Sequence, residues 1–441
     1  MKRTIENELI QWKNQPNRLP LIIRGARQVG KTYTVTQFGK AHFHNCVTIN
    51  FEKQHELNAY FDNWHPHEII RKLEITLNTT ITPQETLLFL DEIQDCPNAL
   101  MALRYFKEEL PDLHIIAAGS LLEFSLEAPK FRMPVGRIQF LYMYPLSFEE
   151  WLLATGKDKK YDFIRTVQLS DSIDKSLHQN LLEEFNLYTL IGGMPAVINT
   201  FIETKSYQES LKQQANLIEA YQNDFNKYAT KTQVNHLKTI LKKTPSLVGT
   251  QIKYSRIDSD SPALAIKTSI GLLQKAGLIT QIIHSHASGL PLGAETKDTI
   301  FKLLFLDIGL MQYQMGITKD LFNSDLSLIH KGSLAEQIVG QELLAIQPSY
   351  QAPNLYYWHR TEKNSQAEID YLIQSGKHII PIEVKSGKRG SLRALSLFLN
   401  EKKQPFGVRI STHPMSKEQD LISLPLYLTS QIYRLIEKME G

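Results

Sequence analysis

A glycine-containing loop between an apolar run and a helix-like stretch constrains this chain more than any other feature. The apolar run is Leu19-Pro-Leu-Ile-Ile23, and the loop after it has the pattern G-x-x-x-x-G-K-[ST]. The loop consists of Gly25, Ala26, Arg27, Gln28, Val29, Gly30, Lys31 and Thr32. Glycines let backbone amides turn inward around a polyphosphate, and the next helix directs its partially positive N-terminus at the same anion. The pattern predicts a phosphate loop in which Lys31 meets the β and γ phosphates and Thr32 holds Mg²⁺.

Two adjacent acidic residues follow a second apolar run. Thr86-Leu-Leu-Phe-Leu90 leads directly into Asp91 and Glu92. A buried parallel strand delivers such carboxylates to its C-terminal edge. We expect Asp91 to join the Mg²⁺ shell and Glu92 to be the base that activates water for attack on the γ phosphate.

A third apolar run, Leu113-His-Ile-Ile-Ala-Ala118, ends in Gly119-Ser120. This order places a small hydroxyl residue near the same strand edge. Ser120 is a candidate for orienting the attacking water or contacting the γ phosphate. The alternative is ordinary turn chemistry, in which glycine and serine are common.

Several further segments, taken with these motifs, resemble a group of prokaryotic AAA-family ATPases. The segments are Leu90-Asp-Glu-Ile-Gln94, Gly136-Arg137, Tyr144-Pro-Leu-Ser-Phe-Glu-Glu150, Ile191-Gly-Gly-Met-Pro195, Phe301-Lys302, Leu306-Asp-Ile-Gly-Leu310 and Pro381-Ile-Glu-Val-Lys385. Members of the group resemble one another in having an N-terminal ATPase module and a C-terminal region classed as a domain of unknown function. The resemblance covers nearly the whole chain. The resemblance implies ATP as the ligand but indicates almost nothing about the biological role.

Length and composition limit the remaining classes. The chain has 441 residues, which suggests two to four domains, and its formal charge of +3 provides no global basic field for nucleic acid. Two cysteines, Cys46 and Cys96, are too few and too far apart for a disulfide framework or a zinc site, and they fit a reducing cytosol. No run reaches about eighteen apolar residues, so we expect a cytoplasmic protein without membrane insertion.

The order of strand and helix signals predicts the α/β fold class. Residues 1–155 alternate the two signals, as expected for a P-loop NTPase with a parallel sheet, helices on both faces and ATP at the carboxyl edge. Residues 156–235 have helical periodicity, which Ile191-Gly-Gly-Met-Pro-Ala196 interrupts. We interpret that break as a structural turn rather than a second phosphate loop, because no Lys-Thr or Lys-Ser follows it.

The pattern of residues 236–315 predicts a winged helix-turn-helix, with three helix-like segments before a β wing. The segment 261–279 begins with a cap and a proline, has helical spacing, and ends in Ala-Gly before a strand. One interpretation is a recognition helix in DNA with Lys267 and Lys275 near phosphate. The other is a module that packs between domains, and the few basic residues leave both open.

The final block, 325–441, holds a second possible site. A helix is expected from Gly332 to about Ile346, followed by strands at 354–359, 367–373 and 378–385. Glu336, Asp370, Glu383 and Lys385 then resemble the carboxylates and lysine of a PD-(D/E)-x-K nuclease fold, although Asp370 follows Ile369 rather than proline. Alternation along the strand places Glu383 and Lys385 on one face. The three acids could hold Mg²⁺ or Mn²⁺ against a phosphodiester; alternatively, the fold only binds or packs.

Two hypotheses of function follow. The first is a Mg²⁺-dependent ATPase whose nucleotide state moves a DNA-interacting, nuclease-like C-terminal half. The second is a slow nucleotide switch or scaffold that signals through protein partners, with an inactive nuclease-like domain. Arg137 is the candidate cation for the transition state, in its own subunit or across the interface of a homo-oligomer. A surface ion pair is the alternative for Arg137, and Arg132 and Arg104 are other candidates for the role.

Overall fold

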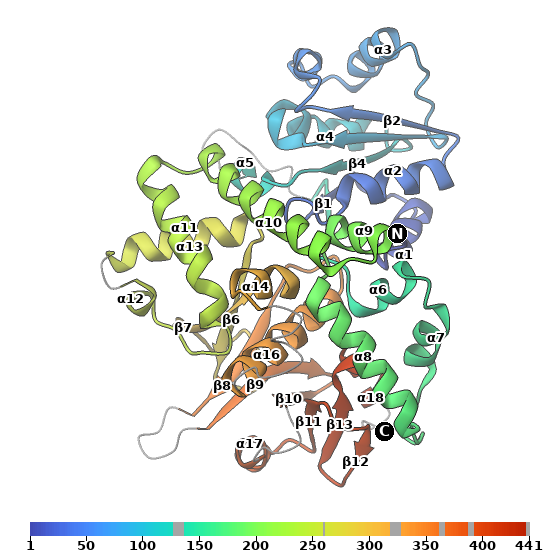
Figure 1. Ribbon diagram of the computed structural model, residues 1–441. Helices are drawn as coiled ribbons and strands as arrows, with labels where there is room; N and C mark the ends of the chain where they lie inside the picture. The colour runs from blue at the N-terminus through green and yellow to red at the C-terminus, as the bar shows by residue number, and fades with distance from the viewer. Residues whose placement is uncertain (127–135, 259–260, 318–327, 361–366, 387–391, 438–441) are drawn as a thin grey trace.

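Two β-sheets and the helices between them organise the structure (Figure 1). The computed structural model describes residues 1–126, 136–258, 261–317, 328–360, 367–386 and 392–437. The first sheet has five strands in the order β2-β3-β4-β1-β5, and the second has eight in the order β12-β13-β11-β10-β9-β8-β6-β7. In Figure 1 the five-stranded sheet lies at the top and the eight-stranded sheet at the bottom.

The strands of the first sheet are all parallel to their neighbours. They are β1 (Leu21–Arg24), β2 (Asn45–Asn50), β3 (Thr86–Asp91), β4 (His114–Ala118) and β5 (Gln139–Tyr142). The first four confirm predicted strands. The fifth lies outside the prediction, because four residues without a long apolar run give little signal.

Alternate residues of these strands face two different apolar clusters, as the side-chain period of a strand requires. Leu21 and Ile23 pack in a cluster with residues of α1 (Ile5–Asn14) and α2 (Lys31–His42). Ile22 packs in another with residues of α3 (Pro66–Leu77) and α4 (Pro97–Glu109). Helices therefore cover both faces of the sheet, and the predicted α/β fold class is confirmed.

A layer of helices follows the first sheet. It comprises α6 (Phe148–Ala154), α7 (Asp158–Thr166), α8 (Lys175–Ile191), α9 (Pro195–Thr204) and α10 (Tyr207–Asp224), whereas the short α5 (Leu122–Leu126) lies between β4 and β5 in the chain. The predicted break is confirmed, because α8 ends before Gly192, whose φ is +83°, and α9 starts at Pro195. No single helix in the described part of the chain is long and apolar enough to cross a membrane; α8 and α9 pass that test only as a pair bent by 117°.

Three helices and a hairpin occupy the region that was expected to be winged. They are α11 (Lys231–Leu247), α12 (Tyr254–Ile257), α13 (Ala263–Lys275), β6 (Ile279–Ser285) and β7 (Thr296–Phe305), with α14 (Ile308–Gln314) after them. This order agrees with the predicted elements. The assignment as a DNA-binding winged helix stays a prediction.

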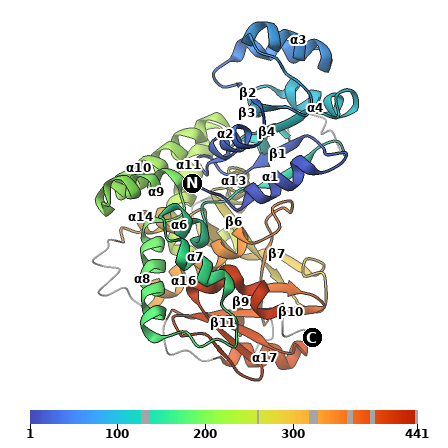
Figure 2. The same ribbon diagram turned by 90° about the vertical axis from the view of Figure 1, so that its right-hand side faces the viewer.

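The larger sheet extends from this hairpin into the C-terminal block. Its remaining elements are α16 (Leu328–Ala345), β8 (Leu355–His359), β9 (Glu368–Ser375), β10 (His378–Val384), α17 (Arg393–Lys402), β11 (Gly407–Ser411), β12 (Ser416–Lys417), β13 (Leu421–Pro425) and α18 (Ile432–Ile436). β6 pairs in parallel with β8. One sheet therefore crosses the predicted limit between 236–315 and 325–441, and the four domain limits stay predictions. Figure 2 shows the sheet beneath the N-terminal region.

Candidate functional site

The phosphate loop has the backbone conformation that its glycines allow. Gly25 has a φ of +145°, and Gly30, which caps α2, has a φ of +101°. A Cβ atom on Gly25 would lie 2.2 Å from the carbonyl oxygen of Met143. A larger residue is therefore excluded at Gly25 by both conformation and space. The loop lies at the C-terminal end of β1 and opens onto the N-terminus of α2, as predicted.

The amine of Lys31 lies folded against its own loop. Its Nζ donates hydrogen bonds to the carbonyl oxygens of Gly25, at 2.8 Å, and Ala26, at 2.9 Å. Burial lowers the pKa of Lys31 to about 8, against the opposing effect of the carboxylates of Glu92 and Asp91. The side chain is thus a buried cation, which suits the binding of an anion.

Thr32 and Asp91 are brought together at the start of α2 and the end of β3. The Thr32 hydroxyl donates to both carboxylate oxygens of Asp91, at 3.1 Å each, and the Asn50 amide donates to Oδ2 at 3.0 Å. Burial and the neighbouring charge of Glu92 raise the pKa of Asp91. A hydroxyl beside a carboxylate at a phosphate loop is a donor set that fits Mg²⁺.

Glu92 and Ser120 also lie close together, at the ends of β3 and β4. The backbone N–H and the hydroxyl of Ser120 donate to Oε2 of Glu92, at 3.4 and 3.3 Å, and the amide of Gln94 donates to the same oxygen at 2.7 Å. In the described part of the chain, these hydrogen bonds of Glu92 leave its Oε1 available. Ser120 therefore contacts the predicted base, and its predicted contact with the attacking water or the γ phosphate stays a prediction.

Seven of the predicted residues line a cavity of about 430 Å³. Its lining includes Arg27, Gln28, Gly30, Lys31, Thr32, Glu92 and Ser120. Gly25 and Ala26 line a neighbouring cavity of about 550 Å³, and Val29 is buried in the core. Arg27 forms an ion pair with Asp224 of α10 at 2.5 Å.

Sequence reasoning missed several residues of the cavity. Arg3 and Asn199 contribute to its lining. The guanidinium of Arg3 donates to the carbonyl oxygens of Val29, at 2.8 Å, and Tyr144, at 2.6 Å, and it pairs with Glu150 at 3.1 Å. A lone arginine far from the loop in sequence carries no pattern that could have identified it.

Comparison with known proteins agrees with this geometry. Residues 17–152 match the family described as AAA domain. The N-terminal region is a P-loop ATPase domain. Residues 182–321 and 331–427 match two families, each described as a domain of unknown function, DUF8612 and DUF4143. No match was found among curated proteins.

Solved structures of several other proteins resemble the chain at low identity. The Walker-type ATPase PABY2304 of Pyrococcus abyssi is 14% identical, with a TM-score of 0.45, and the match covers 71% of this chain and 95% of that one. The Aeropyrum pernix ORC2 protein is 13% identical, with a TM-score of 0.34 and coverages of 72% and 94%. The Thermotoga maritima RuvB branch migration motor is 14% identical, with a TM-score of 0.27 and coverages of 67% and 89%. Similarity this low carries no function to this chain.

Arg137 lies away from the cavity of the ATPase domain. It precedes β5, which runs parallel to β1 with Gln139 opposite Leu21, so Arg137 lies at the end of the sheet opposite to the phosphate loop. Its guanidinium pairs with Glu108 at 3.2 Å, and its side chain is 46% exposed. Within its own subunit it does not reach the phosphate loop. Its role across a subunit interface stays a prediction, and the alternative candidate Arg132 lies outside the described residues.

The residues of the predicted nuclease-like site are neighbours at the C-terminal sheet. Ile382 of β10 pairs with Tyr371 of the antiparallel β9, so Glu383 and Asp370 occupy the next position along the two strands. Asp370 accepts a hydrogen bond from the backbone N–H of Val384 at 2.8 Å, and Lys385 bonds to Glu383. The predicted placement on adjacent strands agrees with the structure.

A lysine that sequence reasoning did not assign lies among these acids. The Nζ of Lys302, on β7, is 3.0 Å from Oε2 of Glu336 and 3.4 Å from Oδ1 of Asp370. Burial and the charge of Asp370 raise the pKa of Glu336 to about 8, and they raise that of Glu383 to about 7. Among the described residues, no three His, Cys, Asp or Glu side chains are arranged to hold a metal ion. The arrangement therefore does not fit the second metal site that was predicted.

Proposed function

We propose that the ATPase domain binds ATP with Mg²⁺ and hydrolyses it, and that its nucleotide state is transmitted to the C-terminal region. One observation carries the proposal. The phosphate loop, the Thr32–Asp91 pair and the Glu92–Ser120 pair converge at the carboxyl edge of one parallel sheet. The N-terminus of α2 and the amine of Lys31 suit a polyphosphate, and the hydroxyl of Thr32 beside Asp91 suits Mg²⁺.

Lys31 would bind the nucleotide by exchanging acceptors. Its amine gives up the carbonyl oxygens of Gly25 and Ala26 and donates to phosphate oxygens instead, so that no buried donor is left unpaired. A phosphate also favours the charged form that burial disfavours. Mg²⁺, when bound, neutralises phosphate charge.

Glu92 would accept the proton of the attacking water. Its Oε2 is held by Ser120 and Gln94, so Oε1 is the oxygen that remains for the proton. A base held in one orientation acts without first having to be ordered. Ser120 is accordingly proposed as a positioning residue for Glu92.

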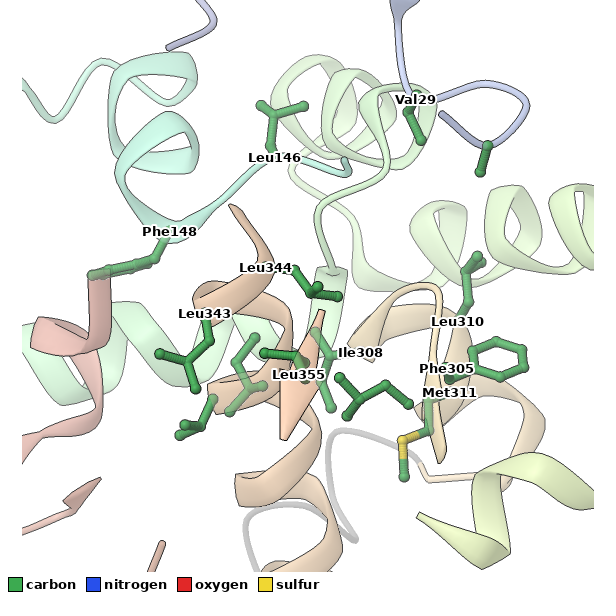
Figure 3. Packing of buried hydrophobic residues seen from close by; sticks show 14 of the residues in the cluster. Val29, Leu146, Phe148, Phe305, Ile308, Leu310, Met311, Leu343, Leu344 and Leu355 are labelled. Atoms are coloured by element: carbon green, nitrogen blue, oxygen red, sulfur yellow. The ribbon is translucent and has the colours of Figure 1, made fainter. Parts of the chain in front are cut away.

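Two hydrogen-bonded segments support the proposed transmission. Leu146 lines the nucleotide cavity; its N–H donates to the carbonyl oxygen of Gly193 at 2.7 Å, and the N–H of Gly193 donates to Asp307 at 2.6 Å. Two residues further on, the N–H of Phe148 donates to Glu342 of α16 at 2.9 Å. Figure 3 shows buried residues of the one apolar cluster that includes Val29, Leu146, Leu310 of α14 and Leu344 of α16. The segment that contains the cavity-lining Leu146 is thus linked by hydrogen bonds to Asp307, directly before α14, and to Glu342 of α16.

Nucleic acid is the partner class that we propose for the C-terminal half. The arrangement of α11, α12, α13 and the β6–β7 hairpin supports it. The turn after α13 packs on the phosphate loop, where a Cβ atom on Gly277 would be 3.0 Å from the Cβ of Ala26. The turn at the C-terminal end of α13 therefore packs against the ATPase domain, whereas the N-terminal half of α13, with Leu264 75% exposed, is open to a partner.

ATP turnover tests the proposal. Purified protein should hydrolyse ATP with Mg²⁺, and Lys31→Ala should lose nucleotide binding, because the substitution removes the cation at the phosphates. Unchanged ATP affinity in Lys31→Ala would refute the assignment of the site. DNA that strongly stimulates turnover supports a nucleic-acid partner. No response to DNA, with tightly retained nucleotide, supports the switch that acts through proteins.

Transmission is tested at Gly193. A Cβ atom there would lie 2.3 Å from the carbonyl oxygen of Leu146, whereas one on Gly271 of α13 would meet nothing within 4 Å. In the wild type, ATP should change hydrogen exchange in α16, and Gly193→Ala should weaken that change while Gly271→Ala keeps it. If hydrogen exchange in α16 is the same with and without ATP in the wild type, the proposed transmission is wrong.

A further inference from the structure

A buried ammonium group occupies the centre of the C-terminal carboxylates. Lys302 is fully buried, and its Nζ contacts Glu336, Asp370 and also Glu368. These carboxylates come from α16 and β9, and the lysine comes from β7. The cation is therefore supplied by an element that precedes the whole nuclease-like block in sequence.

The ammonium group stands where a shared metal ion would have to bind. Glu336 directs Oε2, and Asp370 directs Oδ1, at the same nitrogen atom. A divalent ion that bridged the two carboxylates would need this position, since metal–oxygen bonds are shorter than these contacts. Lys302 also supplies the positive charge without which two buried carboxylates would be costly.

A backbone segment covers the same acids. Ile252 exchanges backbone hydrogen bonds with Phe301, next to Lys302, at 2.8 and 3.2 Å. The amide of Gln251 donates to Glu368, and a Cβ atom on Gly249 would be 3.0 Å from Oε1 of Glu336. Residues 249–252 therefore lie over the carboxylates that a phosphodiester would have to approach.

We propose that Lys302 takes the place of a divalent metal ion, so that the C-terminal region keeps the arrangement of a nuclease-like site but neither binds Mg²⁺ there nor cleaves nucleic acid. The inference is independent of ATP hydrolysis, because it concerns a separate cluster. It assigns Lys302 a structural role at the position where the sequence predicted a metal.

Binding of Mn²⁺ to the nucleotide-free, full-length protein tests this inference. Lys302→Ala should bind more Mn²⁺, followed by electron paramagnetic resonance, than the wild type, because it frees Glu336 and Asp370. Adding Asp370→Asn to that variant should abolish the gain. Lys297→Ala, which removes an exposed lysine from the same strand, is the matched control and should behave like the wild type.

Two results would overturn the inference. One is a folded Lys302→Ala protein, by circular dichroism, that binds no more Mn²⁺ than the wild type. The other is Mn²⁺ binding or DNA cleavage by the wild type that Asp370→Asn abolishes. If Lys302→Ala does not fold, the wild type and Asp370→Asn are compared instead. Equal Mn²⁺ binding by these two proteins, with no cleavage by either, supports the inference.

Discussion

Lys31, a residue of the phosphate loop, and Arg3, which lies outside it in the sequence, both donate hydrogen bonds to backbone carbonyls of the loop. Lys31 donates hydrogen bonds to the carbonyl oxygens of Gly25 and Ala26, and Arg3 donates one to the carbonyl oxygen of Val29. In a trans peptide the C=O and the following N–H point in opposite directions. By holding the Val29 carbonyl, Arg3 therefore fixes the direction of the Gly30 N–H, one of the groups that a phosphate would meet.

Replacing Arg3 should weaken nucleotide binding. A hydrogen bond from a charged donor contributes about 1.5–3 kcal/mol, so Arg3→Met should raise the Kd for ATP roughly tenfold or more. The rate of hydrolysis of bound ATP should change little, because Arg3 does not contact Glu92. Isothermal titration with ATP measures the affinity. Lys2→Met, an exposed neighbour, is the control, and equal affinity in wild type and Arg3→Met would contradict the assigned role.

The residues that sequence reasoning found are those that a local pattern marks. The phosphate loop is contiguous, and Asp91 and Glu92 end a strand, so sheet topology alone brings them together. Alternation along β9 and β10 placed Asp370 and Glu383 correctly. Arg3 and the role of Lys302 could not be derived, because their partners lie on elements distant in sequence and the contact depends on tertiary packing.

At the scale of elements, α16 connects the two sites. It carries Glu336 in the C-terminal cluster and Glu342, which accepts the N–H of Phe148, two residues beyond the cavity-lining Leu146. The two glutamates are six positions apart, which is roughly 9 Å along the helix axis. A shift of α16 would therefore displace Glu336 and Glu342 together. This coupled displacement is the physical basis of the transmission proposed above.

Glu342 should make stability depend on pH. Burial raises its pKa to about 8 from an ordinary value of 4.5, although the Phe148 N–H and the Tyr188 hydroxyl donate to it. A carboxyl group with a raised pKa favours the folded state when protonated. Its contribution is fully present below pH 4.5 and is lost as the pH rises to about 8.

Chemical denaturation of Glu342→Gln measures this contribution. Glutamine keeps the uncharged form, so the variant should gain stability relative to the wild type as the pH rises from 5 to 8, by on the order of a few kcal/mol. Asp307, whose pKa burial raises to about 6, is common to both proteins and cancels in the difference. Glu219→Gln, which changes an exposed acid of α10, should show no such trend. A constant difference across this range would contradict the burial of a protonated Glu342.

At the scale of the whole molecule, the two halves pack through one continuous apolar core. This core contains residues of β1, α8, α14, α16 and β10. The continuity of the larger sheet could not be predicted, because Ile282 pairs with Leu355 across more than seventy intervening residues and no local pattern reports a parallel pairing. The α/β class and the order of elements could be predicted, because each depends on local periodicity.

Arg137 could meet a nucleotide only across a subunit interface, because it lies at the end of the sheet opposite to the phosphate loop of its own subunit. If subunits associate, Arg137→Ala should lower ATP turnover, by roughly 10³-fold or more where it meets the γ phosphate. ATP affinity should stay the same. Arg104→Ala removes the other partner of Glu108 from the same surface, and a fall in turnover in that variant instead would assign the role to Arg104. Unchanged turnover in Arg137→Ala, with ATP affinity intact, would leave Arg137 as a surface ion pair.

Glu92→Gln shows whether this cavity both binds and hydrolyses ATP. ATP binding and single-turnover hydrolysis should be measured on the same preparation. The substitution keeps the shape and the bonds of Glu92 to Ser120 but removes the base, so the variant should retain ATP while hydrolysis falls by roughly 10²–10⁴-fold. Hydrolysis at the wild-type rate, or loss of ATP binding as severe as that expected for Lys31→Ala, would contradict the account.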